Sequence, residues 1–409
     1  MTYPAALDWL YGSQLHGIKL GLEPIRRLCD GLGLDLTGGG GPVFIHVAGT
    51  NGKGSVCAMI DAICRSAGLR TGLYTSPHLI TFRERIRLDG EQISERDVAA
   101  GLTAIRDLSA DWEHAPTFFE IATALALAWF RDQRVQVAVL ETGLGGRLDA
   151  TNVVTPAVSV LTSIGLDHTH YLGTTIAEIA AEKAGIIKPR VPVVSAPQVP
   201  EARAVIRRVA EKQHAHLFTV TQPWDRSPAG LPGVHQRWNA MLAFAAAKAI
   251  RLGVTIGDAS RGLAAVSWPG RFQRIGDRIV LDGAHNPDAA ARLAETWRGE
   301  FGAEKATLIL GAMRDKDVRA ICAALRPIAA RVIAVPVQNP RACTPPELCE
   351  IARGVDPGWP CEPVASIAAA LAAAERHAEK ILIAGSLFLV GEVLAHFDPA
   401  SAAPERTVQ

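Results

Sequence analysis

The sequence predicts an α/β protein built from two units, each with a mostly parallel sheet covered by helices. From residue 43 onward, short β-branched runs alternate with helical stretches, a pattern typical of repeated strand-helix-strand units. At about 150 residues per domain, the 409 residues predict two or three domains. The Trp268-Pro269-Gly270 break separates two such series. We therefore expect a large domain over residues 1–270 and a smaller domain over residues 271–409.

In the large domain, the first predicted strand covers residues 43–48 and is followed by a glycine-rich turn and a helix over residues 56–67. Apolar residues recur at helical spacing in that helix, and Gly68 ends it. Further strands are expected at residues 135–140, 158–162 and 191–195, with helices at 119–130, 175–184 and 201–212.

The smaller domain continues the alternation without an internal repeat, which excludes a solenoid. Its strands are expected at residues 279–281, 307–310, 332–335 and 381–383, and its helices at 287–298, 316–325, 345–353 and 366–378. This order predicts a second sheet with helices between its strands.

The composition is that of a folded protein without a charge bias. The chain has 42 basic and 41 acidic residues, a net charge of +1, and 48% hydrophobic residues. Such a surface has no excess positive potential for phosphate backbones or anionic lipid, so we expect neither nucleic acid nor a membrane as a partner. The start of the chain lacks the basic segment followed by an apolar segment that is typical of a signal peptide, so we expect a cytoplasmic protein. We also expect a monomer.

The cysteine pattern points away from disulfide bonds. The seven cysteines are an odd number, and no two have C-x-x-C spacing. We therefore expect neither a disulfide framework nor a zinc ribbon, and a reducing compartment fits best. Residues 398–409 form a short low-complexity end that we expect to be frayed.

A glycine-rich loop, Gly49-Thr50-Asn51-Gly52-Lys53-Gly54-Ser55, lies between the first strand and its helix. The backbone N–H groups of such a loop can wrap a phosphate chain, and the helix N-terminus adds positive potential. We expect Lys53 to contact the β and γ phosphates of a nucleotide. The loop differs from the usual G-x-x-x-x-G-K-[ST] pattern because Gly54 separates the lysine from Ser55. An ordinary glycine-rich turn is the alternative interpretation.

Glu141 ends a predicted strand and is followed by glycines. Its carboxylate is therefore expected at the carboxyl edge of the sheet, where α/β proteins bind ligands. Mg²⁺ prefers oxygen ligands and keeps several waters, so one glutamate, a serine hydroxyl and substrate phosphates form a suitable set. A histidine nitrogen would be a less usual donor.

The glycine-rich loop resembles the ATP loop of the Mur ligase superfamily, and further motifs narrow the resemblance to the folylpolyglutamate synthase family, which includes bifunctional dihydrofolate synthases. These motifs span nearly the whole chain and comprise Tyr74-Thr75-Ser76-Pro77-His78-Leu79, the run from Glu141 to Asn152, Leu166-Asp167-His168-Thr169, Glu182-Lys183-Ala184-Gly185-Ile186, Pro269-Gly270-Arg271-Phe272 and Asp282-Gly283-Ala284-His285-Asn286-Pro287. The resemblance implies a large P-loop ATPase domain and a smaller Rossmann-like glutamate-ligase domain.

The resemblance also implies a metal site. It implies that Ser76, Glu141 and His168 are Mg²⁺ ligands. By residue type alone, a serine before a proline is usually a turn residue, and an Asp-His pair usually caps a helix.

For Lys183, the resemblance implies carbamylation, which converts the amine into a carboxylate that helps to hold a second Mg²⁺. Addition of CO₂ requires a buried, deprotonated amine. The alternative is a solvated helix lysine paired with Glu178 or Glu182, which the residues alone would favour.

Nucleotide contacts are implied in both domains. The set consists of Asn51, Gly52, Lys53, Gly54 and Ser55 in the loop, Asn239 on the adenine side, and Arg271, Asp282 and His285 from the junction and the second domain. A planar guanidinium at position 271 would neutralise charge as the γ-phosphoryl group moves.

A folate pocket is implied by three segments, namely Ile18-Lys19-Leu20, Thr117-Phe118-Phe119-Glu120 and Arg147-Leu148-Asp149. An aromatic side chain can stack on a pterin ring, although either phenylalanine is equally consistent with plain core packing. Lys19 stands where the bifunctional members are expected to carry an acidic residue, which weakens the expectation of dual activity.

The implied reaction is amide formation between L-glutamate and dihydropteroate, and addition of further glutamates to tetrahydrofolate, through an acyl phosphate. The cofactors would be ATP and two Mg²⁺ ions, with K⁺ as a further candidate. Alternatives are folylpolyglutamate synthesis alone, a nucleotide-binding switch without ligase activity, and a Mur-type peptidoglycan precursor ligase. Only 42 residues precede the first strand, which argues against the nucleotide-sugar domain of a Mur-type ligase. A dehydrogenase is excluded because Gly143-Leu144-Gly145-Gly146-Arg147 lacks the final glycine of G-x-G-x-x-G.

Overall fold

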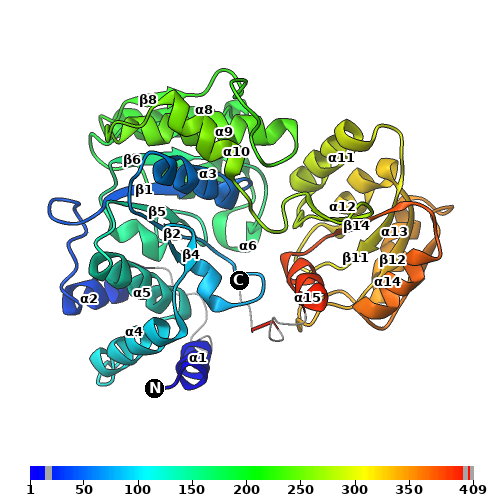
Figure 1. Ribbon diagram of the computed structural model, residues 1–409, viewed down its shortest axis with the longest axis horizontal. Helices are drawn as coiled ribbons and strands as arrows, with labels where there is room; N and C mark the ends of the chain where they lie inside the picture. The colour runs from blue at the N-terminus through cyan, green and yellow to red at the C-terminus, as the bar shows by residue number, and fades with distance from the viewer. Residues whose placement is uncertain (14–20, 399–403, 406–409) are drawn as a thin grey trace.

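The computed structural model describes residues 1–13, 21–398 and 404–405, and it contains two α/β bodies that lie side by side (Figure 1). The larger sheet has eight strands in the order β4 (Glu91–Gln92), β3 (Ile86–Leu88), β2 (Thr71–Tyr74), β5 (Val137–Glu141), β1 (Val43–Ala48), β6 (Val158–Leu161), β7 (Val193–Ser195) and β8 (Leu217–Thr219). The smaller sheet has six, in the order β13 (Cys361–Pro363), β12 (Ala329–Ala334), β11 (Ala306–Leu310), β14 (Lys380–Ala384), β10 (Ile279–Leu281) and β9 (Gln273–Ile275). Both sheets are mostly parallel, which confirms the predicted fold class.

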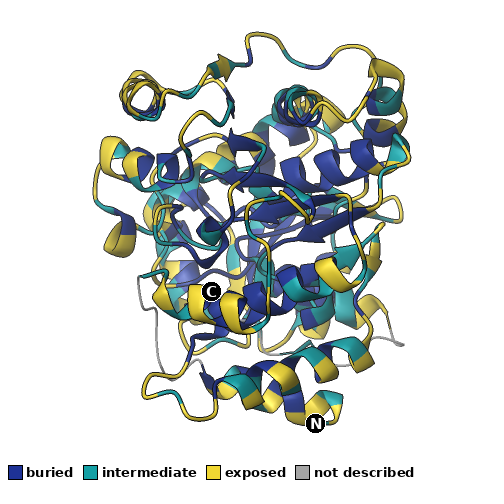
Figure 2. Ribbon diagram, turned by 90° about the vertical axis from the view of Figure 1, so that its left-hand side faces the viewer, coloured by how far each residue is buried: buried dark blue, intermediate teal, exposed yellow. Residues whose placement is uncertain are grey.

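Helices cover both faces of the larger sheet, so that its central strands β2, β5, β1, β6 and β7 are buried between them (Figure 2). One face packs against α3 (Lys53–Ser66), α9 (Val234–Ala249) and α10 (Ile256–Ala265). The other face packs against α1 (Tyr3–Gly12), α2 (Glu23–Gly31), α4 (Glu95–Leu108) and α5 (Phe118–Asp132). The helices α7 (Ile176–Ala184) and α8 (Pro200–Lys212) pack on β6 and β7 in a cluster of their own. The short helices are η2 (Phe82–Arg85), η3 (Ala150–Val153) and α6 (Thr169–Leu172).

The smaller body has the same layered arrangement. The helices α11 (Pro287–Phe301), α12 (Val318–Leu325) and α13 (Pro345–Val355) cover one face of its sheet, and η4 (Arg326–Ile328) follows α12. The helices α14 (Ile367–Glu375) and α15 (Leu387–Phe397) cover the other face.

Local sequence signals set several helix starts. Thr117 and Glu120 form a capping box at the start of α5, and Thr175 and Glu178 do the same for α7. These reciprocal bonds satisfy N–H groups that have no partner inside a helix. The helix α3 has no side-chain cap and begins after Gly52, which has φ 89°. This open N-terminus belongs to the phosphate-loop candidate.

Each predicted strand and helix is present, with ends displaced by a few residues. The larger shifts, of three residues each, are at the starts of α3 (53 rather than 56) and β12 (329 rather than 332) and at the ends of α11 (301 rather than 298) and α14 (375 rather than 378). The strands β2, β3, β4, β8, β9 and β13 were not predicted, nor were the helices α1, α2, α4, α6, α9, α10 and α15 or the short helices η2, η3 and η4.

One expectation is wrong, and a second, for residues 398–409, does not hold at Glu405, one of the three described residues there. Cys349 on α13 and Cys361 on β13 form a disulfide, because the chain turns back between them and packs the strand on the helix. The C-terminal end is not frayed at Glu405, since its carboxylate accepts hydrogen bonds from the Tyr3 hydroxyl (2.9 Å) and the Phe82 backbone N–H (2.6 Å). Within the described ranges, no helix combines the length and apolar character needed to cross a membrane.

Candidate functional site

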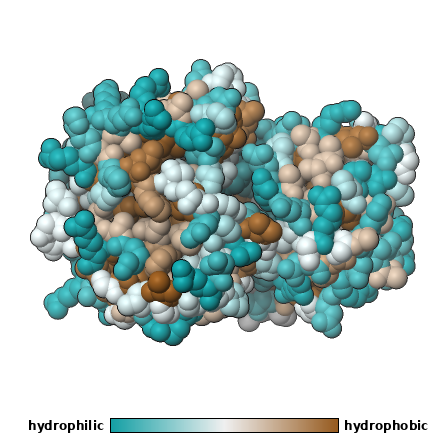
Figure 3. All heavy atoms as spheres, turned by 90° about the horizontal axis from the view of Figure 1, so that it is seen from above, coloured by the Kyte–Doolittle hydropathy of each residue, from teal (hydrophilic) through white to brown (hydrophobic). Residues whose placement is uncertain are grey.

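A cleft of about 1070 Å³, its open mouth included, lies where the two bodies meet. Its wall combines the carboxyl edge of the larger sheet with loops of the smaller body. The lining residues that the sequence singled out are Asn51, Gly52, Lys53, Gly54, Ser55, Ser76, Glu141, His168, Lys183, Asn239, Arg271, Asp282 and His285. Figure 3 shows the two lobes next to one another from above, with hydrophilic side chains over much of that face. One cavity therefore holds all the expected nucleotide and metal residues.

The glycine-rich loop joins β1 to α3 at the floor of the cleft. A Cβ on Gly54 would lie 3.1 Å from Nε1 of Trp268 and 3.6 Å from Oε2 of Glu141, so a side chain here would crowd both. Lys53 is the first residue of α3, and its Nζ lies 3.4 Å from the carbonyl oxygen of Thr50. A curled loop with a lysine at an uncapped helix N-terminus is suited to bind phosphate groups.

Glu141 ends β5 and is the register partner of Val47 on β1, which places it beside the glycine-rich loop. Burial raises the pKa of its carboxyl, whereas the positive charge of Lys53 and Arg271 lowers it. The backbone N–H of Ser76, which precedes a cis peptide bond to Pro77, donates to Oε2 of Glu141 (3.2 Å). Ser76 and Glu141 are thus neighbours at one edge of the sheet.

Lys183 lies at the last turn of α7 and is 3% exposed. Its Nζ donates to the carbonyl oxygen of Gly49 (2.8 Å). The two glutamates of the alternative interpretation are engaged elsewhere, since Glu178 caps its own helix and Glu182 pairs with Arg147 (2.8 Å). Burial, reinforced by the charge of Lys53, lowers the pKa of Lys183 to about 7. The interpretation as a solvated, paired lysine is therefore wrong.

His168 precedes α6 and has φ 50°, a left-handed conformation that turns the chain into the cleft. Burial lowers the pKa of its imidazole to about 4, although the charge of Asp167 opposes this shift. A neutral imidazole has a free lone pair, which a metal ligand requires.

Asp167 is the counterion of this region. Burial would raise the pKa of its carboxyl, but His168, His285 and Lys316 together hold it well below the ordinary value. The sequence motif contains this aspartate, for which no role was predicted. Lys316 and Asn286, which contact it from the smaller body, also had none.

The smaller body contributes Arg271, Asp282 and His285 to the cleft. Asp282 accepts from the backbone N–H groups of Phe272 and Ala284, each at 2.8 Å, so its carboxylate orders the loop around Arg271. His285 contacts the carbonyl oxygen of Gly283 through Nδ1 (2.8 Å). Because a carbonyl only accepts, Nδ1 carries the proton.

Asn239 on α9 lies against the glycine-rich loop. Its Oδ1 would be 3.0 Å from a Cβ on Gly52, and its Nδ2 donates to Oε1 of Gln236 (3.0 Å). Gln236 in turn donates to the hydroxyl of Ser55 (3.4 Å). The buried Gln236 and the neighbouring His235, which also lines the cleft, were not singled out by the sequence analysis.

The folate-pocket residues have mixed surroundings. Phe118 is buried and stacks on Tyr11, with ring centroids 5.7 Å apart, whereas Phe119 is less buried and lies against Gly143. Asp149 is buried and accepts from the backbone N–H groups of Gly143 and Leu144 at 2.8 and 2.9 Å. Asp149 therefore orders the loop after β5. The Thr117 hydroxyl donates to the Glu120 carboxylate at the start of α5. Arg147 and Leu148 lie in the same loop as Asp149. Ile18, Lys19 and Leu20 lie outside the described residues.

The donor set fits Mg²⁺. Among the described residues, no three His, Cys, Asp or Glu side chains are grouped so that they could hold a metal by themselves. Mg²⁺ needs no such cage, because it keeps waters and binds substrate phosphates beside one or two carboxylates. Glu141 is a buried carboxylate at the phosphate-loop candidate, with Ser76 adjacent and His168 lining the same cleft.

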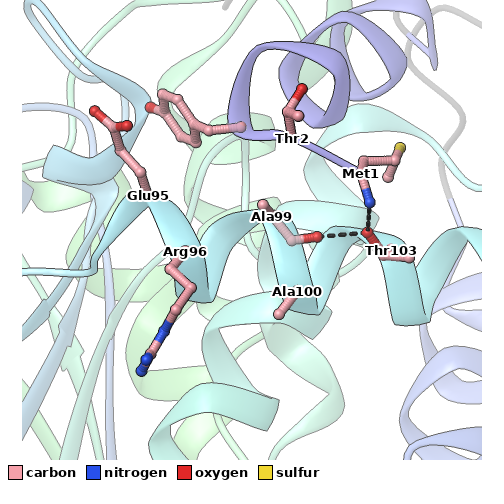
Figure 4. Close-up of a pocket in the computed structure, with 8 residues that line it drawn as sticks. Met1, Thr2, Glu95, Arg96, Ala99, Ala100 and Thr103 are labelled. Atoms are coloured by element: carbon pink, nitrogen blue, oxygen red, sulfur yellow. Dashed lines mark hydrogen bonds between the residues drawn. The ribbon is translucent and has the colours of Figure 1, made fainter.

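A second hollow lies at the other end of the larger body, between the start of the chain and α4 (Figure 4). There the Met1 amine donates to the Thr103 hydroxyl (2.9 Å), which donates to the carbonyl oxygen of Ala99 (2.6 Å). These bonds tie the N-terminus to α4, which is a structural role.

Known proteins are similar to this chain in both sequence and fold. The Mur ligase middle domain matches residues 47–194, and the Mur ligase, glutamate ligase domain matches residues 270–387. Dihydrofolate synthase/folylpolyglutamate synthase of Bacillus subtilis strain 168 is 35% identical, over 96% of this chain and 98% of that protein. The structure of Escherichia coli FolC in complex with DHPP and ADP has a TM-score of 0.86 at 33% identity, over 97% of this chain and 98% of that chain. Bifunctional folylpolyglutamate synthase/dihydrofolate synthase from Yersinia pestis, complexed with AMPPNP and Mn ion, has a TM-score of 0.87 at 30% identity, over 97% of this chain and 98% of that chain.

Proposed function

Because the chain belongs to the dihydrofolate synthase/folylpolyglutamate synthase family of Mur ligases, and is therefore an ATP-dependent ligase, we propose that it joins L-glutamate to dihydropteroate and adds further glutamates to tetrahydrofolate. The observation that carries this proposal is the single cleft that gathers Lys53, Glu141 and Arg271 from two bodies. ATP and a divalent metal ion are the cofactors, as in the relatives solved with ADP or with AMPPNP and Mn.

The proposed reaction has two steps. A carboxylate oxygen of the pteroate or folate attacks the γ-phosphorus, and ADP leaves, which gives an acyl phosphate. The amine of glutamate then attacks the acyl carbon, loses a proton, and expels phosphate that carries the carboxylate oxygen. Lys53 and Arg271 offset the negative charge that develops, and closure of the two bodies holds the reactants together. No side-chain nucleophile is required.

We propose that Ser76, Glu141 and His168 hold one Mg²⁺ and that carbamylated Lys183 helps to hold a second, with K⁺ as a further candidate. When bound, these ions neutralise phosphate charge. The burial of Lys183 supports this proposal, since it lowers the pKa of the amine to about 7 and addition of CO₂ requires the deprotonated form. In the cleft, Asn51, Gly52, Gly54, Ser55, Asn239, Asp282 and His285 are the proposed partners of the nucleotide.

For the pterin, we propose a site formed by Phe119 and the loop that Asp149 orders, with Ile18, Lys19 and Leu20 as further contacts implied by the family resemblance. Phe119 is less buried than Phe118, which favours Phe119 as the stacking partner. We further propose that residues 1–270 form the ATP-binding domain and residues 271–409 the glutamate-ligase domain. We also propose that the enzyme is monomeric and cytoplasmic.

The test is phosphate release by purified protein with ATP and Mg²⁺, comparing 7,8-dihydropteroate plus glutamate with tetrahydrofolate plus glutamate. We expect release with both pairs, and none when glutamate is omitted. Release with the second pair alone would reduce the function to polyglutamylation. Nucleotide binding without release in either mixture would favour a nucleotide-binding switch and contradict the proposal.

A further inference from the structure

A buried ion pair joins the two bodies at the cleft. Nζ of Lys316, in the loop between β11 and α12, lies 2.6 Å from Oδ1 of Asp167, in the loop between β6 and α6. The two side chains are only 10% and 8% exposed. A pair so shielded from water is screened little by salt, and removing one partner leaves a charge without compensation.

The other oxygen of Asp167 faces the same body. Nδ2 of Asn286, the N-cap of α11, donates to Oδ2 of Asp167 (3.2 Å), and Nε2 of His285 lies 3.8 Å from it. The carboxylate thus contacts three side chains of the smaller body, and one of them, His285, also lines the cleft.

The loop that carries Asp167 is tied to the glycine-rich loop. The Thr50 hydroxyl donates to the carbonyl oxygen of Gly165 (3.0 Å) and accepts from its N–H (3.1 Å). Asn51 and Asn286 also exchange hydrogen bonds of 2.9 and 3.3 Å across the cleft. A continuous polar chain therefore runs from Lys316 through Asp167 to the loop that would hold the phosphates.

We propose that Asp167 and Lys316 are positioning residues that hold the two bodies closed and place His285 and Asn286 over the glycine-rich loop. The proposal rests on the nucleotide site proposed above. If the pair is lost, a smaller fraction of the enzyme has the competent arrangement, and the apparent affinity for ATP falls by that fraction. Turnover at saturating ATP changes little, because bound nucleotide then supplies the closure.

The experiment compares Lys316→Met, Asp167→Asn and the double variant, with Lys316→Arg as the conservative variant. Arg314→Met is the matched control, since Arg314 lies in the same loop but pairs with Glu347 inside the smaller body (2.8 Å). The readouts are KM for ATP, kcat, binding of AMPPNP, and the radius of gyration of the free enzyme by small-angle X-ray scattering.

We expect Lys316→Met to raise KM for ATP and the dissociation constant of AMPPNP by about 5- to 150-fold, the usual range of such coupling, with kcat within threefold. The free variant has a larger radius of gyration than the wild type, and saturating AMPPNP removes the difference. Lys316→Arg restores most of the affinity, and the double variant is less impaired than the sum of the single changes. Arg314→Met leaves all four readouts unchanged.

Two results would overturn the proposal. A fall of kcat beyond 100-fold at saturating ATP, with unchanged radius and AMPPNP affinity, would place Lys316 on the reacting phosphoryl group. Unchanged KM and radius in a folded Lys316→Met variant would show that the pair has no positioning role. Scattering needs no substrate, so a wild type that binds no AMPPNP would contradict the nucleotide site, while the radius would still report on the ion pair.

Discussion

Replacing Lys183 by methionine tests whether this lysine is a buried neutral amine. Methionine keeps the length and apolar character of the side chain but cannot be charged. Lys183 is 3% exposed, and its pKa falls from 10.5 to about 7, mainly because of burial. This difference corresponds to about 5 kcal/mol of preference for the neutral amine in the folded state.

The pH dependence follows from proton binding. Above pH 10.5 the amine is neutral in both folded and unfolded chains. Between pH 10.5 and 7 the unfolded chain binds a proton that the folded chain does not, so wild-type stability falls by about 1.4 kcal/mol for each pH unit as the pH is lowered. Below pH 7 both states are protonated, and the penalty stays constant. The advantage of Lys183→Met over the wild type should therefore grow by about 2 to 3 kcal/mol from pH 9 to pH 7.

The assay is urea-induced unfolding of both proteins at pH 7, 8 and 9 in buffer free of CO₂. Lys212→Met on the exposed end of α8 is the control for the loss of a lysine at the surface. A difference between wild type and Lys183→Met that is the same at all three pH values would refute the reasoning. Because burial lowers the pKa of Lys183 to about 7, its amine is mainly neutral at pH 8, and ¹³C-bicarbonate should label the wild type and not Lys183→Met in a ¹³C NMR spectrum.

Three further predictions concern single side chains. Lys53→Met should lower kcat by about 100- to 1,000-fold, measured by steady-state ADP release, because a positive charge aimed at the transferred phosphoryl group is lost. Gly146→Ala should lower the free energy of unfolding by about 1 to 3 kcal/mol in urea titrations, because its Cβ would lie 2.8 Å from the carbonyl oxygens of Glu182 and Lys183. Glu405→Gln should lower it by about 1 to 3 kcal/mol, because hydrogen bonds to a charged acceptor are weakened.

Each of these changes has a matched control. Lys248→Met on α9 should leave kcat unaltered, and equal losses in the two lysine variants would argue against a role in phosphate binding. Gly299→Ala on α11 has no atom within 4 Å of its Cβ and should stabilise the protein slightly. Glu113 is exposed, so Glu113→Gln should leave the free energy of unfolding unchanged. An equal loss of that free energy in Glu113→Gln and Glu405→Gln would show that the anchoring of the C-terminal segment does not stabilise the fold.

Elements with a strong local signal were predictable. The β-branched run of β1 predicts a strand, and the helical spacing of apolar residues in α3 predicts a helix. The glycine-rich loop between them is recognisable from its composition. The strand β2 has only four residues, Thr71-Gly72-Leu73-Tyr74, and is defined by its parallel pairing with β5 rather than by its own pattern. The helix α15 is apolar almost all round, so it lacks the one-sided pattern that marks an amphipathic helix.

Some residues of the candidate site were likewise predictable from a local pattern, and others were not. Lys53 and Glu141 follow from residue type and position at strand ends, whereas Ser76, His168 and Lys183 required the family resemblance. Lys316 had no signal at all, since its partner Asp167 is 149 residues away along the chain. The Cys349–Cys361 disulfide likewise depends on how α13 and β13 pack, which no spacing rule describes.

The central claim is that the cleft activates a carboxylate by phosphorylation so that glutamate can capture it. The most direct measurement uses tetrahydrofolate labelled with ¹⁸O in its terminal carboxylate, incubated with ATP, Mg²⁺ and glutamate, followed by mass spectrometry of the released phosphate. We predict one ¹⁸O atom in each phosphate formed with amide. Phosphate without ¹⁸O, formed at the same rate as the amide product, would contradict the acyl phosphate and with it the chemistry assigned to the cleft.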